Sequence, residues 1–130
     1  MSRLLLDSTV LIDALRGRQA AARVAGLRRT GIEPWACVVS VEEIWRGIHA
    51  AEQSTARRLF RGLRIAPLGV AEGIRAGSWR RDFAGRGITL HQADCLIAAA
   101  AVGVGADLAT ANVGDYPMTG LQVERWPIGT

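Results

Sequence analysis

Short apolar segments with high β-propensity alternate with amphipathic helical segments along the whole 130-residue chain. The segments expected to form strands are 3–6, 34–39, 64–68, 107–109 and 122–126, and the expected helices are 8–16, 19–29, 41–50, 53–61, 70–83 and 90–102. Strands separated by helices form βαβ units, in which parallel strands are covered by helices on both faces. The sequence therefore predicts an α/β protein with three layers (α/β/α) and a mainly parallel central sheet of four to five strands.

The length fits one domain, spanning residues 1–130, with a single core. All 16 basic residues are arginine and the net charge is +4, which makes polyanions plausible partners because guanidinium groups match phosphate oxygens. A GC-rich coding sequence would give the same arginine usage. The lack of lysine excludes a P-loop and Schiff-base chemistry.

The apolar stretch at the N-terminus is interrupted by Asp7 and Asp13, so it does not read as a signal peptide. The longest later apolar run, 96–106, is shorter than the roughly 20 residues that span a bilayer. We therefore expect a cytoplasmic protein with no membrane association. Cys37 and Cys95 are isolated in the sequence and are expected to be small buried hydrophobic residues.

Acidic residues follow two of the expected strands. Asp7 comes directly after the first strand, where capping of the next helix is the commoner role of an Asp and membership of an acidic site is the alternative. Glu43 lies in SVEEIWRG, where Ser40 and Glu43 have the spacing of a capping box. Glu43 also shares a helical face with Gly47, which leaves space beside its carboxylate. Neighbouring Glu42 is its competitor for a functional role.

Two further acids lie near the C-terminus. Asp94 is expected about one turn inside an alanine-rich helix whose capping box is Thr89 and Gln92, and a buried unpaired carboxylate there would be costly. Asp115 follows the fourth strand in a segment rich in turn residues. Asp13, in contrast, is expected to be a solvated or structural helix residue.

Ligands of open parallel sheets bind beyond the carboxyl ends of the strands, so we expect these four carboxylates to converge there. Carboxylates that lie close together raise each other's pKa unless a cation intervenes. Mg²⁺ or Mn²⁺ is the natural cation, because both prefer carboxylate oxygens and retain bound water. An acidic metal site in an arginine-rich chain indicates a nuclease.

The motifs LLLDSTVLIDALRG, VEEIWRG, DCLIAAAAVG and TANVGDY occur in this order across nearly the whole chain. In them the sequence resembles the PIN-domain ribonucleases, and among these the VapC-type toxins of bacterial type II toxin–antitoxin systems. The resemblance implies a PIN-like fold in which four acids bind the metal and carry catalysis. These acids are Asp7, Glu43, Asp94 and Asp115.

The resemblance also implies supporting roles for Thr110 and Asn112, which would orient ligands or water, and for Ser8, which is suited to the metal shell or to capping. Two positions depart from the family pattern. Ala111 stands where arginine is often found, which removes one expected RNA contact. Tyr116 replaces a common phenylalanine, which we interpret as a mild change.

As a member of this family, the chain would be an Mg²⁺- or Mn²⁺-dependent endoribonuclease that cleaves structured cellular RNA and so inhibits translation. The family further implies a homodimer and a cognate antitoxin bound in a groove. Trp45 and Ile48 form a helical apolar stripe that is either a wall of this groove or part of the core.

Other functions fit the sequence less well. A haloacid-dehalogenase-type phosphotransferase would need a second aspartate where the chain reads DSTV, and a receiver domain would need a lysine. A metal-free ribonuclease would have to use His49 and His91 as acid and base, and both are expected to be structural. The alternative that stays open is an RNA- or partner-binding PIN-like domain with a vestigial acidic site and no catalytic activity.

Overall fold

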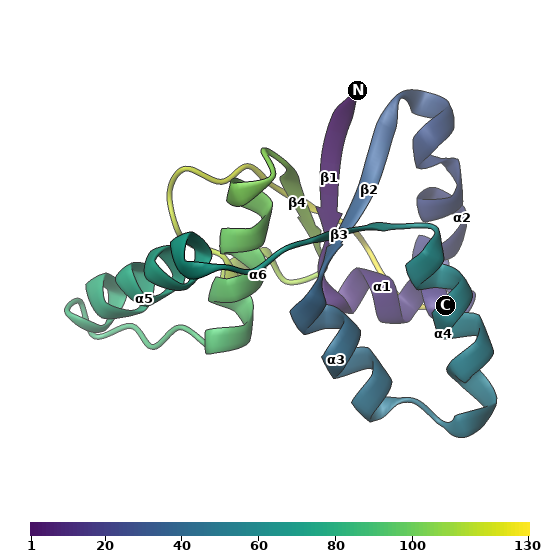
Figure 1. Cartoon of the computed structure of the whole chain (residues 1–130), viewed down its shortest axis with the longest axis horizontal. Coiled ribbons are helices and arrows are strands. Elements are labelled where there is room, and N and C mark those ends of the chain that lie inside the picture. Colours follow the sequence, from purple (N-terminus) through teal and green to yellow (C-terminus); the bar gives the residue numbers. More distant parts are fainter.

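The computed structural model describes all 130 residues and contains one five-stranded sheet in which every strand pair is parallel. The strand order is β3-β2-β1-β4-β5, so β1 is central (Figure 1). The strands are β1 (Ser2–Leu6), β2 (Ile32–Cys37), β3 (Arg64–Ala66), β4 (Asp107–Thr110) and β5 (Val123–Arg125). This all-parallel sheet confirms the predicted fold class.

The helices cover both faces of the sheet. They are α1 (Ser8–Leu15), α2 (Gln19–Gly26), α3 (Val38–Gly47), α4 (Gln53–Arg61), α5 (Val70–Ala84) and α6 (Gln92–Gly103), together with three short 3₁₀ segments at Leu27–Thr30, Ala50–Glu52 and Val113–Asp115. In Figure 1, α5 and α6 lie to the left of β1, while α1 to α4 lie below it and to its right. None of these helices has the length and apolar composition needed to cross a membrane.

The three leucines of β1 show how both faces are buried. Leu4 and Leu6 pack in a core cluster with residues of α1, α2 and α4, whereas Leu5 packs in a second cluster with the alanines of α6. Side chains of a strand point alternately to opposite faces, so a continuous apolar run fits a strand with helices on both sides. The carboxyl end of this buried strand is Asp7.

Two helix starts differ from the predictions. Val38 and Val39 belong to the first turn of α3 and not to a strand, because β2 ends where Cys37 pairs with Ala66 of β3. Ser40 is therefore inside α3, and the expected Ser40–Glu43 capping box is wrong. Helix α6 begins at Gln92 with His91 as its N-cap, so the Thr89–Gln92 box is wrong as well.

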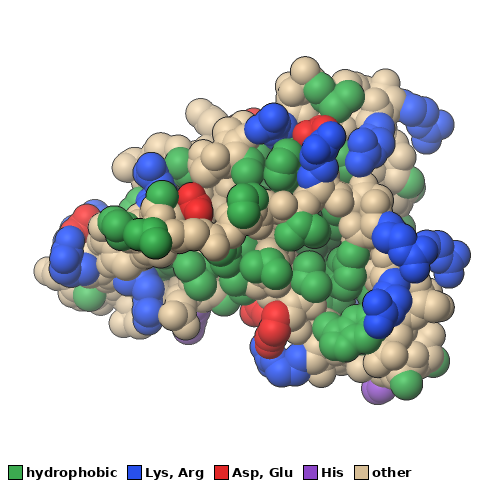
Figure 2. Space-filling view, viewed as in Figure 1, with side chains coloured by type: hydrophobic (Ala, Val, Ile, Leu, Met, Phe, Trp, Pro, Cys, Tyr) green, Lys and Arg blue, Asp and Glu red, His purple; other side chains and the backbone are tan.

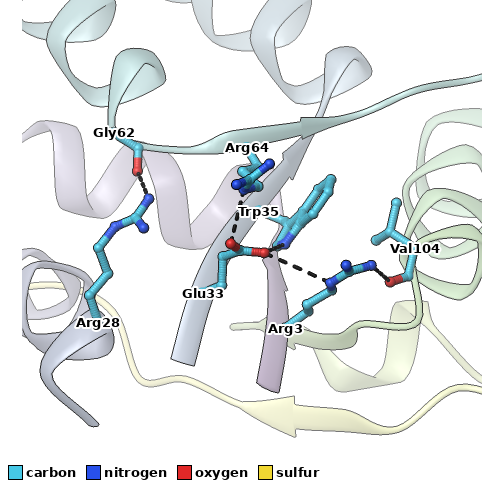
Figure 3. Close-up of polar contacts among 7 residues, drawn as sticks. All are labelled: Arg3, Arg28, Glu33, Trp35, Gly62, Arg64 and Val104. Carbon is cyan, nitrogen blue, oxygen red and sulfur yellow. Dashed lines mark hydrogen bonds and ion pairs between the residues drawn. The ribbon is translucent and has the colours of Figure 1, made fainter. Parts of the chain in front are cut away.

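At the amino ends of the strands, Glu33 joins three strands through polar contacts (Figure 3). Its carboxylate accepts hydrogen bonds from Trp35 Nε1 at 2.8 Å and from Arg64 Nε at 2.9 Å, and it pairs with Arg3 Nε at 3.8 Å. The hydrogen bond from Trp35 is the largest cause that lowers the pKa of Glu33. Acidic and basic groups at this end of the sheet thus neutralise each other.

Asp13 is only 2% exposed, so the expectation of a solvated residue is wrong and a structural role is correct. Its carboxylate accepts backbone hydrogen bonds from Ala20 at 2.8 Å and from Gly129 at 2.9 Å. The carbonyl of Gly129 accepts a further bond from the backbone of Gln19 at 2.9 Å. Asp13 therefore ties α1, the start of α2 and the C-terminal segment together.

Candidate active site

Asp7 stands at the carboxyl end of β1 and is 3% exposed. Its backbone is extended, and its side chain caps α1. The carboxylate oxygen Oδ1 accepts hydrogen bonds from the backbone N–H of Thr9 at 3.0 Å and of Val10 at 3.2 Å. It also accepts one from the Thr9 hydroxyl, Oγ1, at 2.5 Å. The second oxygen, Oδ2, accepts a hydrogen bond from the Tyr116 hydroxyl at 3.2 Å. The predicted capping role of Asp7 is confirmed, and it occupies only one of the two oxygens.

Glu43 projects from α3 toward the start of α1. Its Oε1 accepts a hydrogen bond of 2.7 Å from the hydroxyl of Ser8, and Ser8 Oγ also hydrogen-bonds the buried Ser40 Oγ at 2.8 Å. Its competitor Glu42 is exposed and forms an ion pair with Arg46 one turn later, at 2.7 Å. The structure thus places Glu43, and not Glu42, next to the residue that follows Asp7.

Asp94 is the third residue of α6 and is half-buried. It lies in the first turn of the helix, where the helix dipole favours an acid, so it is placed earlier and is more exposed than predicted. Burial raises its pKa first, and the charges of Asp115, Asp7 and Glu43 raise it further, while nearby His91 lowers it. The four predicted carboxylates therefore lie in one region of the molecule, where the charges of three of them reach Asp94.

Asp115 is exposed and ends the 3₁₀ segment Val113–Asp115, which follows β4. Together with Asp94 and His91 it lines a small hollow of about 150 Å³. Thr110 is buried at the end of β4, and its hydroxyl accepts a 3.0 Å hydrogen bond from the backbone of Asn112. Thr110 therefore shapes the turn that leads to Asp115, while Asn112 is exposed.

None of the four carboxylates forms an ion pair with an arginine. Every ion pair of the structure uses Glu33, Glu42 or Glu52. A group of carboxylates without an ion-pair partner, one of which has a raised pKa, has the donor chemistry that a hard divalent cation requires. Asp7 and Asp94 would hold such an ion, with Glu43 and Asp115 beside them.

The arrangement is nevertheless not a closed set of ligands. As the side chains stand, no three of the Asp, Glu, His and Cys residues are close enough together to hold one metal ion. Asp7 and Glu43 are each held by hydroxyl groups, and the like charges repel one another. Binding of an ion would therefore have to draw the carboxylates together.

Three residues of this region were not identified from the sequence. Tyr116 and Thr9 hold Asp7, and Ser40 contacts the Ser8 hydroxyl that holds Glu43. Thr9 Oγ1 also accepts a 3.1 Å hydrogen bond from the backbone of Ala111, which joins α1 to the turn after β4. The available signal was the position of Thr9 and Tyr116, each within two residues of a predicted ligand.

Comparison with known proteins identifies the family of this chain. A family model described as PIN domain matches residues 4–114. The chain therefore belongs to the PIN-domain family.

Within the family the chain is of the VapC type. It is 37% identical over 117 residues to Ribonuclease VapC10 of Mycobacterium tuberculosis, with 88% of this chain and 86% of the relative covered. It is 34% identical over 122 residues to Ribonuclease VapC19 of the same organism, with 88% and 92% covered.

Solved structures share the fold at lower identity. VapBC2 from Rickettsia felis, solved bound to a DNA fragment from its promoter, has a TM-score of 0.85 at 18% identity, covering 96% of this chain and 99% of that one. VapBC-1 from nontypeable Haemophilus influenzae has a TM-score of 0.80 at 20% identity, covering 95% and 98%. These likenesses confirm the PIN-like architecture.

Proposed function

We propose that this protein is a divalent-metal-dependent endoribonuclease that acts in the cytoplasm as the toxin of a toxin–antitoxin pair, cleaving structured cellular RNA and so inhibiting translation. The observation that carries the proposal is that four carboxylates, after β1, on α3, on α6 and in the turn after β4, lie close enough together for the charges of three of them to raise the pKa of the fourth, Asp94. The relatives VapC10 and VapC19, which are named ribonucleases, support it.

The residues of the chain have separate tasks in this reaction. Asp7 and Asp94 would hold the ion, Mg²⁺ or Mn²⁺, and Glu43 and Asp115 would lie beside it. When bound, the ion supplies activation of a water molecule and stabilisation of negative charge at the scissile phosphate. Ser8 fixes the carboxylate of Glu43, and the turn shaped by Thr110 and Asn112 carries Asp115.

The test is cleavage of a structured RNA by the purified protein with Mg²⁺ and with EDTA. Asp7→Asn and Asp94→Asn should each abolish cleavage and leave the fold intact. Full activity in EDTA, or in either variant, would refute the proposal. The alternative is a vestigial site without catalytic activity, which the open arrangement of the carboxylates favours. It predicts that the protein binds RNA equally well with and without EDTA and cleaves it under neither condition.

We further propose that the antitoxin occupies a groove of about 270 Å³ between α1, α2 and α4. Its floor is apolar and includes Ala21, Val24 and Leu59, while Arg28 and Arg58 line the same groove. A helical or extended segment with apolar side chains and flanking acids complements this surface. The VapBC complexes with the same fold support a partner of this kind.

The groove is testable through Ala25, an exposed residue of α2 that lines it. Ala25→Arg should prevent the complex with the cognate antitoxin, measured by light scattering after size exclusion. Ala84→Arg, at an exposed alanine at the end of α5, is the matched control and should leave the complex intact. Equal binding by both variants would rule out the groove.

We also propose a homodimer formed through the apolar surface around β3. Large exposed side chains lie on both sides of this edge strand: Val38 at the start of α3, Ile65 on β3, and Val70 and Ile74 on α5. Figure 2 shows hydrophobic side chains gathered across the middle of this face. Exposed apolar patches of this kind mark interaction sites.

Ile74→Glu should shift the mass in solution from dimer to monomer, and an unchanged mass would contradict this interface.

A further inference from the structure

Tyr116 is the only tyrosine of the chain, and its ring is 4% exposed. The ring packs in the core cluster that contains the alanines of α6, and the hydroxyl points into the acidic site, where it donates a 3.2 Å hydrogen bond to Asp7 Oδ2. Burial is the largest cause that raises the pKa of Tyr116, followed by the charges of Asp7 and Asp94. The phenol therefore stays a neutral hydrogen-bond donor next to these carboxylates.

The two oxygens of Asp7 have different surroundings. Oδ1 accepts three hydrogen bonds, all from Thr9 and Val10 in the first turn of α1, and so has no capacity left for a metal ion. Oδ2 accepts only the bond from Tyr116, which leaves it one acceptor site. Asp7 can therefore bind a cation only through Oδ2, the oxygen that Tyr116 holds.

The bond from Tyr116 is the one contact made at the oxygen that would bind the cation. The contacts at Oδ1 all come from Thr9 and Val10, which follow Asp7 closely in the chain, so they hold Asp7 only against the start of α1. The hydroxyl of Tyr116, which is anchored by a buried ring, holds the second oxygen. Hydrogen bonds from outside the ligand set that orient a ligand typically contribute about 10–100-fold to metal affinity.

We propose that Tyr116 is a positioning residue of the metal site: it holds Asp7 with Oδ2 directed at the cation and so sets the affinity of the site for Mg²⁺ or Mn²⁺. This inference rests on the proposed metal dependence. It also means that the phenylalanine-to-tyrosine difference from the family pattern is not a mild change, because a phenylalanine ring would fill the core but leave Oδ2 without this donor.

The test is the dissociation constant for Mn²⁺, measured by calorimetry on the folded protein without RNA. Tyr116→Phe should weaken binding about tenfold or more. Met118→Leu, at a buried neighbour in the same core cluster, changes packing but removes no hydrogen bond and should alter the constant by less than about twofold. An unchanged constant in Tyr116→Phe would reduce Tyr116 to a packing role and overturn the inference.

A second measurement uses the wild-type protein and does not depend on the folding of a variant. Because the chain has one tyrosine, labelling tyrosine with carbon-13 at Cζ gives a single NMR signal. This signal should shift on Mg²⁺ addition with the midpoint of metal binding, and a signal that stays fixed while Mg²⁺ saturates the site would overturn the inference. Wild-type protein that binds no Mn²⁺ would instead refute the proposed metal dependence itself, so the two failures are distinguishable.

Discussion

The two roles of Asp7, helix cap and metal ligand, can be separated by replacing it with Asn and with Ala. Asn caps helices as well as Asp does, and its carbonyl keeps the bonds from Thr9 and Val10. Its amide then faces the Tyr116 hydroxyl, whose oxygen can accept a hydrogen bond but whose buried proton loses its acceptor, which costs about 1–3 kcal/mol. We therefore expect the free energy of unfolding of Asp7→Asn to lie about 1–3 kcal/mol below the wild-type value.

Asp7→Ala should be less stable than Asp7→Asn by the energy of the cap. It also leaves the buried hydroxyl of Tyr116 without an acceptor, which costs about 1–3 kcal/mol, and in addition it loses the cap, which contributes about 1 kcal/mol. The sum is about 2–4 kcal/mol, which lowers Tm by about 8–16 °C at roughly 4 °C per kcal/mol for a domain of this size.

The assays are urea denaturation in EDTA for stability and RNA cleavage with Mg²⁺ for function. Both variants should lose cleavage, whereas Asp82→Asn, at an exposed acid of α5, should change neither quantity. If Asp7→Ala proves as stable as Asp7→Asn, the capping energy assigned to Asp7 is wrong. If Asp7→Asn cleaves RNA at the wild-type rate, its role as a ligand is wrong.

Three further predictions follow from the titratable groups. The pKa of Asp94 is raised above its unfolded value of 3.8, so the ionised form of Asp94 destabilises the metal-free fold. Asp94→Asn should therefore raise Tm at pH 7 in EDTA. This gain in Tm should vanish as the pH falls below about 4. The pKa of Tyr116 is raised above its unfolded value of 10.0, so the stability it contributes is complete below about pH 10 and is lost as the pH rises further. Absorbance at 295 nm should accordingly show tyrosinate only when the protein unfolds, and ionisation in the intact fold would contradict this. Asp13→Ala removes two backbone hydrogen bonds to a buried carboxylate and should lower the free energy of unfolding, measured with urea, by about 3–5 kcal/mol. A loss below about 1 kcal/mol would show that these bonds are not stabilising.

Most of the fold could be predicted because the apolar pattern and the turn residues agree with it. Helix α4 has the predicted bounds, and the buried run Leu4–Leu6 ends at Asp7 as expected. The start of α3 could not be predicted, because Val38 and Val39 have high β-propensity and only the pairing of β2 with β3 shows where the strand ends. Tertiary context overrides local preference at this point.

The carboxylates of the candidate site could be chosen because strand ends meet at one edge of a parallel sheet. The side chains that hold them could not. The contact between Tyr116 and Asp7 joins residues 109 positions apart, and no local pattern indicates that a phenol will reach a carboxylate. For the same reason the sequence could not decide between a solvated and a structural Asp13, since one of its two donors is Gly129.

The connection between Asp13 and Gly129 has a practical consequence for protein engineering. Because Gly129 both donates to Asp13 and accepts from Gln19, it is a structural part of the α1–α2 junction. A truncation that removes Gly129 would take one of the two hydrogen-bond donors from the buried carboxylate of Asp13. An affinity tag is therefore better joined at the amino end of β1, which is the opposite end of that strand from Asp7.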